Sequence, residues 1–126
     1  MIIGIGTDII EVDRIKKSIE NYGDRFRKKI FSDKEIEYCE QFNDQKWVHY
    51  AARFAAKESF SKAIGTGITN GFKFNEISIL NEQSGKPYIL LDGNMLQSWG
   101  HCNALISLSH TRDNAIAYII LEVPDK

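Results

Sequence analysis

Asp8 is the first acidic side chain of the sequence that could bind a ligand. It follows Gly4 and Gly6 on one face of an expected strand. Residues without side chains leave room above a sheet for another group to approach the backbone. The same aspartate could instead cap a helix that begins near Val12, because aspartate is a common N-cap. The residues alone leave both interpretations open.

Glu58 lies in the middle of an apolar stripe of an expected helix, where an unpaired charge would be costly. A cation must therefore face it, either Lys62 one turn later in an ordinary i,i+4 pair or a metal ion. The opposite side of the helix is also apolar, which disfavours a purely exposed pair. We interpret Arg53, Lys57, Glu58 and Lys62 as one partly buried site for phosphate and a divalent cation.

Ser109 and His110 stand at the end of a further expected strand. A serine beside a histidine suggests nucleophilic catalysis. On an extended strand, however, neighbouring side chains point to opposite faces, which disfavours proton transfer between the two. A histidine that binds phosphate at the edge of a sheet explains His110 better, and an ordinary loop histidine is the alternative.

The elements that position these residues follow from the spacing of apolar side chains. We expect a strand over 2–10, a helix from 12 that stops at Gly23, a short basic helix over 25–30, a helix from the capping box of Ser32 and Glu35 to about 42, a long helix over 46–64, a hairpin of strands over 72–80 and 87–91, a short helix over 95–99, and strands over 105–109 and 115–123. Because strands and helices are segregated along the chain, this order predicts an α+β fold. A mostly antiparallel sheet would pack against a long central helix plus short helices.

Composition sets the class of protein. The 126 residues have no Pro- or Ser-rich linker, so we expect a single domain over 1–126. The longest apolar run, 115–121, is too short to cross a membrane. The apolar first ten residues lack the basic start of a signal peptide, and Cys39 and Cys102 form no metal or disulfide spacing. We therefore expect a cytoplasmic protein with reduced thiols and no membrane partner.

Basic side chains gather in one segment of a chain whose net charge is only −1. Residues 14–29 hold seven Lys and Arg against two acidic residues, a local balance of +5. A domain that binds nucleic acid is usually basic as a whole, so a nucleic-acid partner is not expected. A compact basic patch suits docking of an acidic protein or a ligand that carries phosphate. A solvated helix face is the plainer alternative.

Five segments together resemble the holo-[acyl-carrier-protein] synthases, the small homotrimeric class of 4′-phosphopantetheinyl transferases. They are residues 4–10, 53–63, 65–68, 85–87 and 107–110, in the family's order, and the likeness extends from residue 2 to about 122. The most specific is Phe-x-x-Lys-Glu-x-x-x-Lys over 54–62. The resemblance implies Mg²⁺-dependent transfer of the 4′-phosphopantetheine arm of coenzyme A to a serine of apo acyl carrier protein in fatty acid biosynthesis. Adenosine 3′,5′-bisphosphate would be released.

The resemblance also implies roles for single residues. Asp8 and Glu58 match the positions that hold Mg²⁺, and Lys62 matches a lysine that contacts phosphate and steadies or protonates the leaving group. The serine proton would go to a metal-bound water or to Glu58. The residues implied in binding coenzyme A are Arg53, Lys62, Gly65, His110 and Thr111.

The basic segment resembles the surface on which the family docks its acidic carrier protein. The residues expected there are Arg14, Lys17, Arg25 and Lys28. The family also places its active sites between neighbouring subunits, so we expect a homotrimer.

Two other functions are weighed against this one. A metal-dependent phosphatase with Asp8 as nucleophile normally has a second aspartate two positions later, and Ile10 stands there instead. A carrier-protein-binding module without transfer activity would have no need for Asp8, Glu58 and Lys62 together.

Overall fold

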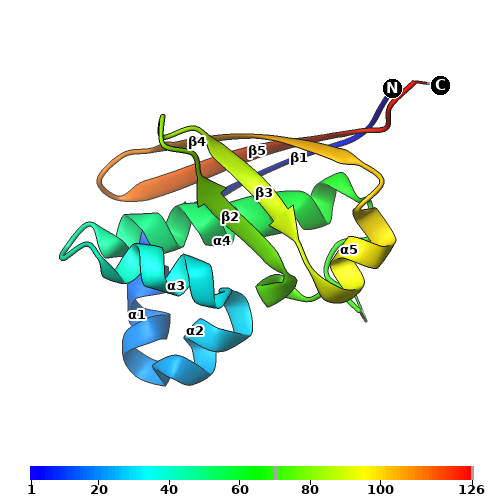
Figure 1. The fold of residues 1–126 in the computed structure, drawn as a ribbon. Coiled ribbons are helices and arrows are strands. Elements are labelled where there is room, and N and C mark those ends of the chain that lie inside the picture. The colour runs from blue at the N-terminus through cyan, green and yellow to red at the C-terminus, as the bar shows by residue number, and fades with distance from the viewer. Residues whose placement is uncertain (70, 126) are drawn as a thin grey trace.

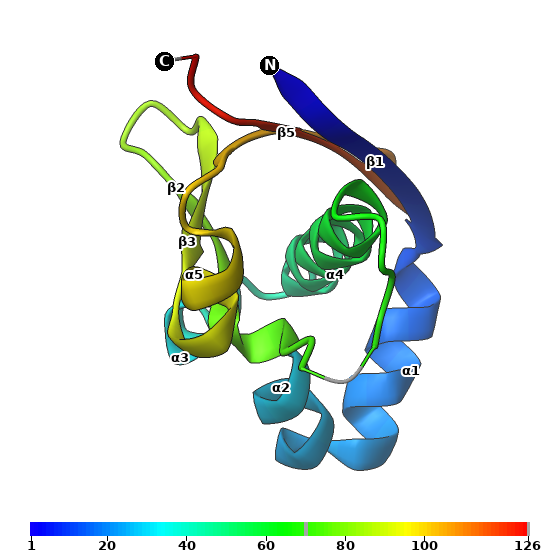
Figure 2. The same ribbon diagram turned by 90° about the vertical axis from the view of Figure 1, so that its right-hand side faces the viewer.

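The long helix α4 (Lys46–Ala63) runs through the middle of the molecule, and the other elements are arranged around it (Figures 1 and 2). The computed structural model describes residues 1–69 and 71–125, so the expected domain range 1–126 includes two residues outside the described part. One antiparallel sheet has the order β1-β5-β4, formed by β1 (Ile2–Glu11), β5 (Asn114–Glu122) and β4 (Asn103–His110). A second antiparallel sheet is the hairpin of β2 (Ile77–Asn81) and β3 (Pro87–Leu91).

Short helices cover the rest of α4. They are α1 (Val12–Tyr22), α2 (Asp24–Ile30), α3 (Asp33–Glu40), the 3-10 turn η1 (Phe74–Glu76) and α5 (Gly93–Trp99). Figure 2 shows α1 and α2 side by side below α4, on the side away from the three-stranded sheet. The predicted α+β fold, with antiparallel sheets packed on a long central helix, is therefore confirmed. No helix of the described residues is both long and apolar enough to span a membrane.

The strand expected over 72–80 is shorter than predicted and begins only at Ile77. The residues before it turn toward α4 instead of pairing with β3. The Phe74 ring stacks on Phe54 with centroids 6.0 Å apart, and the Phe74 carbonyl accepts a hydrogen bond from Lys57. Contacts with the central helix therefore override the strand preference of this segment.

Strand β1 alternates as the sequence predicts. Ile5 and Ile9 are exposed on one face, while Gly4, Gly6 and Asp8 face α4. A Cβ on Gly4 would overlap the carbonyl oxygen of Ala63 in α4, and a Cβ on Gly6 would overlap that of Ser59. The group that approaches the strand across these glycines is therefore the backbone of α4 itself.

Candidate functional site

Asp8, Glu58 and Lys62 meet where β1 crosses α4. The Lys62 ammonium lies 3.2 Å from Asp8 Oδ1 and also donates to the carbonyl oxygen of Thr7 at 2.9 Å. Glu58 lies one turn before Lys62 on the helix. Because Gly4 and Gly6 let α4 approach β1 closely, residues about 50 positions apart in sequence come together here.

The electrostatics of Glu58 show that the two carboxylates share one environment. Partial burial, and then the Asp8 carboxylate, raise the pKa of Glu58, whereas Lys62 and Arg14 lower it. Within the described residues Glu58 forms no ion pair shorter than 4.0 Å, so Lys62 pairs with Asp8 and not with its i,i+4 neighbour. The simple helix pair considered from the sequence is thus not formed.

The alternative role of Asp8, as a helix cap, is also excluded. Helix α1 begins after Glu11, and the N-cap residue makes no hydrogen bond through its side chain. Asp8 instead turns its carboxylate toward Lys62 and is only 20% exposed. The structure therefore favours the ligand-binding interpretation of this residue.

The carboxylate oxygens of Asp8 and Glu58 fit a hard divalent cation. Two carboxylates offer oxygen ligands. Burial, and then repulsion by Asp8, raise the pKa of Glu58, and a cation between the two carboxylates would relieve that repulsion. In residues 1–69 and 71–125, no three His, Cys, Asp or Glu side chains gather as a metal cluster. A pair of carboxylates suits an ion such as Mg²⁺, which keeps several of its waters and takes further oxygens from phosphate.

The prediction of one polar site that includes Arg53 and Lys57 is wrong. Lys57 is fully buried against Glu35, and Arg53, 2% exposed, donates to Asn81 Oδ1 at 2.6 Å. At 100° per residue, positions 53 and 57 share one face of α4, while positions 58 and 62 share another. The sequence spacing already indicated two separate faces, because the members of each pair are four residues apart while the pairs themselves are rotated from each other around the helix.

Arg53 and His110 belong to a second group of basic side chains, together with His49. Burial lowers the pKa of His49, and the charges of Arg53 and His110 lower it further. Arg53 also donates to the His49 carbonyl at 3.3 Å, and the His49 ring packs on Phe42 with centroids 4.2 Å apart. Sequence reasoning missed His49 because a lone helical histidine carries no motif.

This second group is separate from Asp8. Strand β5 runs between β1 and β4: Asp8 and Leu108 both lie opposite Ala117, and His110 lies opposite Ala115. Neighbouring strands are about 4.8 Å apart, so the strand of His110, β4, is two strand spacings away from the strand of Asp8, β1. In one chain, the predicted phosphate-binding residues therefore occupy two places.

Gly65 and Thr111 flank the two groups. Gly65 comes just after Ile64, the C-cap of α4, with φ 84°, and its N–H donates to the Lys62 carbonyl at 3.1 Å. It therefore closes the end of the helix one turn beyond the carboxylate site. Thr111 is exposed in the turn between β4 and β5, where its Oγ1 accepts from the N–H groups of Asp113 and Asn114. The Thr111 hydroxyl hydrogen is free to donate to a ligand.

The predicted docking residues lie on the surface of α1 and α2. Arg14, Lys17, Arg25 and Lys28 are all exposed, and Lys17 pairs with Asp13 at 2.9 Å. Arg14 is close enough to lower the pKa of Glu58. This surface, called the basic patch below, thus borders the carboxylate site.

Comparison with known proteins gives one consistent family. A model of the 4′-phosphopantetheinyl transferase superfamily matches residues 4–119. The chain is 51% identical over 124 residues to a holo-[acyl-carrier-protein] synthase of Ruminiclostridium cellulolyticum, covering 96% of this chain and 92% of the relative. It is 46% identical over 125 residues to one of Clostridium tetani, covering 97% of each.

Solved structures give the same result. A holo-(acyl-carrier-protein) synthase of Bacillus anthracis, in complex with CoA (3′,5′-ADP), superposes with a TM-score of 0.84 at 34% identity, covering 98% of this chain and 99% of that chain. The Helicobacter pylori synthase in complex with coenzyme A gives a TM-score of 0.82 at 30% identity, covering 94% and 99%. The similarity spans nearly the whole chain and confirms the resemblance that the five sequence segments indicated.

Proposed function

The chain belongs to the holo-[acyl-carrier-protein] synthases of the 4′-phosphopantetheinyl transferase superfamily, and on that premise we propose that it transfers 4′-phosphopantetheine from coenzyme A to a serine of an apo acyl carrier protein. The observation that carries the proposal is the meeting of Asp8, Glu58 and Lys62 at one point between β1 and α4. Two carboxylates and a partly exposed ammonium match a substrate that brings a diphosphate. We place the reaction in the cytoplasm, where free thiols such as Cys39 and Cys102 stay reduced.

Asp8 and Glu58 are the proposed ligands of Mg²⁺. When bound, the ion would supply positive charge against the diphosphate of coenzyme A and the charge that develops on its leaving oxygen. The carboxylates of this chain orient that charge, because each is fixed by a regular element. The raised pKa of Glu58 also suits it to accept the proton of the attacking serine.

Lys62 is the proposed partner of the leaving phosphate. The serine oxygen forms a bond to the phosphorus that carries the pantetheine arm, while the bond from that phosphorus to the bridging oxygen breaks. The Lys62 side chain is 55% exposed, so its ammonium can turn from Asp8 to the departing oxygen. There it donates a hydrogen bond or a proton to adenosine 3′,5′-bisphosphate.

His110 and Thr111, both exposed, are proposed to bind the phosphates of the nucleotide from a neighbouring subunit of a homotrimer. Their separation from Asp8 within one chain supports a site completed by a second copy. The outer face of the three-stranded sheet supports an assembly. In the described residues all helices lie on the other side of that sheet (Figure 2), and its apolar side chains are left exposed. They include Ile3, Ile5, Ile9, Leu105 and Tyr118.

Placing a lysine on this outer face should break the assembly. Ile5 is 65% exposed in the single chain and lies opposite Ile120 on this face, so Ile5→Lys puts a charge on the apolar surface at little cost to the fold. Light scattering during size-exclusion chromatography should give about three chain masses for the wild type and one for the variant. The matched control is Leu96→Lys, which replaces an exposed leucine on α5 and should leave the mass of the assembly unchanged. Equal masses for Ile5→Lys and wild type would contradict the proposed interface.

The basic patch is proposed to dock the acidic carrier protein. Arg14 supports this most directly, because it is exposed and is also close enough to Glu58 for its charge to lower the pKa of that residue. A serine delivered across the patch would therefore arrive at the carboxylate site. Charge complementarity of this kind mainly speeds encounter and fixes orientation.

Reversing two charges of the patch should weaken carrier-protein binding selectively. For Arg14→Glu with Lys17→Glu, we expect KM for the carrier protein to rise about tenfold while KM for coenzyme A changes less than about twofold. Steady-state kinetics with each substrate varied in turn measures both values. The wild-type KM for the carrier protein should rise with salt, and the variant's should respond less. Unchanged KM values for both substrates would show that docking occurs elsewhere.

The transfer itself is tested by mass spectrometry of an apo acyl carrier protein after incubation with the enzyme, coenzyme A and Mg²⁺. We expect the mass of one phosphopantetheine group to be added, and replacement of the acceptor serine by alanine should prevent it. Steady release of phosphate from coenzyme A without carrier protein would favour the phosphatase alternative. Binding of the carrier protein without any mass change would favour the inactive module.

A further inference from the structure

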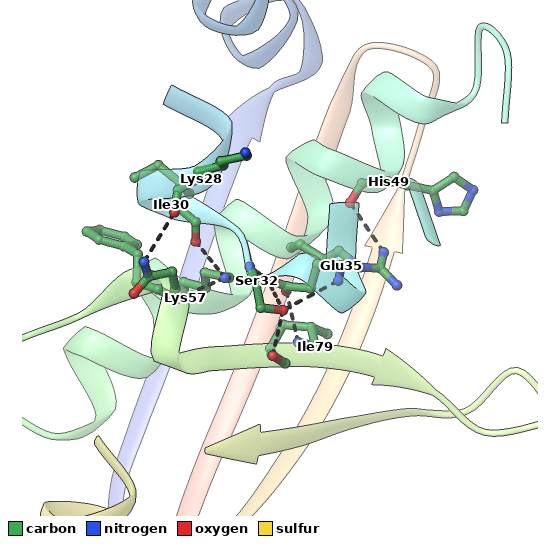
Figure 3. Close-up of polar contacts among 11 residues, drawn as sticks. Lys28, Ile30, Ser32, Glu35, His49, Lys57 and Ile79 are labelled. Carbon is green, nitrogen blue, oxygen red and sulfur yellow. Dashed lines mark hydrogen bonds and ion pairs between the residues drawn. The ribbon is translucent and has the colours of Figure 1, made fainter. Parts of the chain in front are cut away.

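Lys57 and Glu35 form an ion pair in the interior of the molecule, and the proposed mechanism does not use it. Both side chains are 0% exposed, with Lys57 Nζ 2.5 Å from Glu35 Oε1. The Lys57 ammonium also donates to the carbonyl oxygens of Ile30 at 2.7 Å and Phe74 at 2.9 Å. Figure 3 shows the lysine with its partners from different elements.

The hydrogen bonds define the protonation state of the pair. Three acceptors surround Lys57, and only the ammonium form has three hydrogens to donate. Glu35 accepts the backbone N–H of Ser32 through Oε1 and that of Ile79 through Oε2, both at 2.9 Å, so each carboxylate oxygen is occupied. Burial lowers the pKa of Lys57, and the charge of Glu35 opposes that effect. The pair is therefore a fully satisfied buried salt bridge.

The pair joins the helix of the carboxylate site to the helices of the basic patch. Lys57 precedes Glu58 on α4, and its bond to Ile30 holds the last residue of α2. A cation at that end also suits the helix dipole. Helix α2 has only seven residues, so its place depends on such tertiary contacts. Asn75 adds a second tie by donating to the Lys28 carbonyl at 3.1 Å.

We propose that Lys57 and Glu35 are positioning residues for transfer: their ion pair fixes the end of α2, and with it the basic patch, relative to Glu58. The proposal rests on the proposed function, because it concerns where the carrier-protein serine arrives. Small displacements of a docked substrate strongly reduce rates, which makes such an anchor effective. The binding of coenzyme A should not depend on α2, because none of its proposed binding residues lies on that helix.

The test separates positioning from stability by comparing single and double variants. Lys57→Met and Glu35→Gln alone each leave a buried group poorly paired and should lower the melting temperature. The double variant removes both charges, so much of that loss should be recovered. We expect KM for the carrier protein to stay raised about tenfold in the double variant, with KM for coenzyme A within about twofold of wild type.

The control is Leu121→Val, which shortens a fully buried side chain of β5, on the other side of α4 from α2. It should lower stability without changing KM for the carrier protein. Amide hydrogen exchange should be faster in α2 for the double variant and unchanged there for Leu121→Val.

Each possible result either supports or overturns the positioning role of the ion pair. Recovery of the carrier-protein KM together with stability in the double variant would show a purely structural pair and overturn the inference. If the double variant does not fold, Glu35→Gln decides alone, and an unchanged carrier-protein KM for it overturns the inference. A wild-type enzyme that does not modify carrier protein overturns the proposed function, and this inference with it.

Discussion

Replacing Glu58 by alanine should abolish transfer while leaving the fold intact. The change removes one of the two carboxylates that converge between β1 and α4, and with it the proposed acceptor of the serine proton. Asp8 alone cannot hold a divalent cation at the same place with the same occupancy. We expect kcat/KM to fall by about a thousandfold or more.

The stability of this variant should not fall with its activity. Burial and Asp8 raise the pKa of Glu58, so the charged carboxylate is less favourable in the folded state than in the unfolded chain. At neutral pH, Glu58→Ala removes that cost and adds a good helix former. The melting temperature should therefore stay equal or rise. The electrostatic part of the gain should disappear as the pH falls below the ordinary glutamate pKa of 4.5, where the side chain is protonated in both states.

Three measurements examine this prediction together: labelling of apo carrier protein by mass spectrometry, the melting temperature from pH 4 to pH 8, and Mg²⁺ binding by calorimetry. Glu58→Gln is the matched control for shape and should also lose labelling and Mg²⁺ binding. Near-wild-type labelling by Glu58→Ala would contradict the metal role of this residue.

Much of the fold follows from local signals in the sequence. The capping box of Ser32 and Glu35 starts α3 as expected, with both of its hydrogen bonds formed. The alternation of β1 and the glycine that ends α1 are also found as predicted. These features depend on residues within one element, so the chain order is sufficient to identify them.

The features that sequence reasoning missed depend on contacts between distant elements. Lys57 was assigned to a phosphate site, although its partner Glu35 lies 22 positions away. Glu35 was identified only as part of a helix cap, because nothing local indicates that its second oxygen binds the N–H of Ile79. Long-range partners become visible only when the packing of α3 and β2 against α4 is known.

The two glycines of β1 were interpreted correctly as residues that clear space, but the sequence did not show what fills it. Gly6 meets the backbone of α4 at Ser59 and Ala63. That contact sets the distance between the strand that carries Asp8 and the helix that carries Glu58. A close approach of strand and helix is therefore part of the proposed active site as well as of the core.

Adding one methyl group at Gly6 should consequently disrupt both fold and activity. A Cβ there would overlap the Ser59 carbonyl, which belongs to a helix backbone that cannot move without shifting all of α4. We expect Gly6→Ala to destabilise the protein by about 3 kcal/mol, which lowers the melting temperature by about 10 °C. Because the helix is displaced from Asp8, transfer should be lost even where the variant remains folded.

Gly85→Ala is the control that separates overlap from backbone strain. Gly85 lies in the β2–β3 hairpin with φ 95°, and a Cβ there meets nothing within 4 Å. Its replacement should therefore cost only the conformational penalty of about 1 kcal/mol and leave transfer intact. Gly6 is not among the glycines with positive φ, so its larger effect can come only from the contact with α4. A melting temperature of Gly6→Ala equal to wild type, with normal labelling, would mean that α4 does not hold Glu58 against β1 in this way.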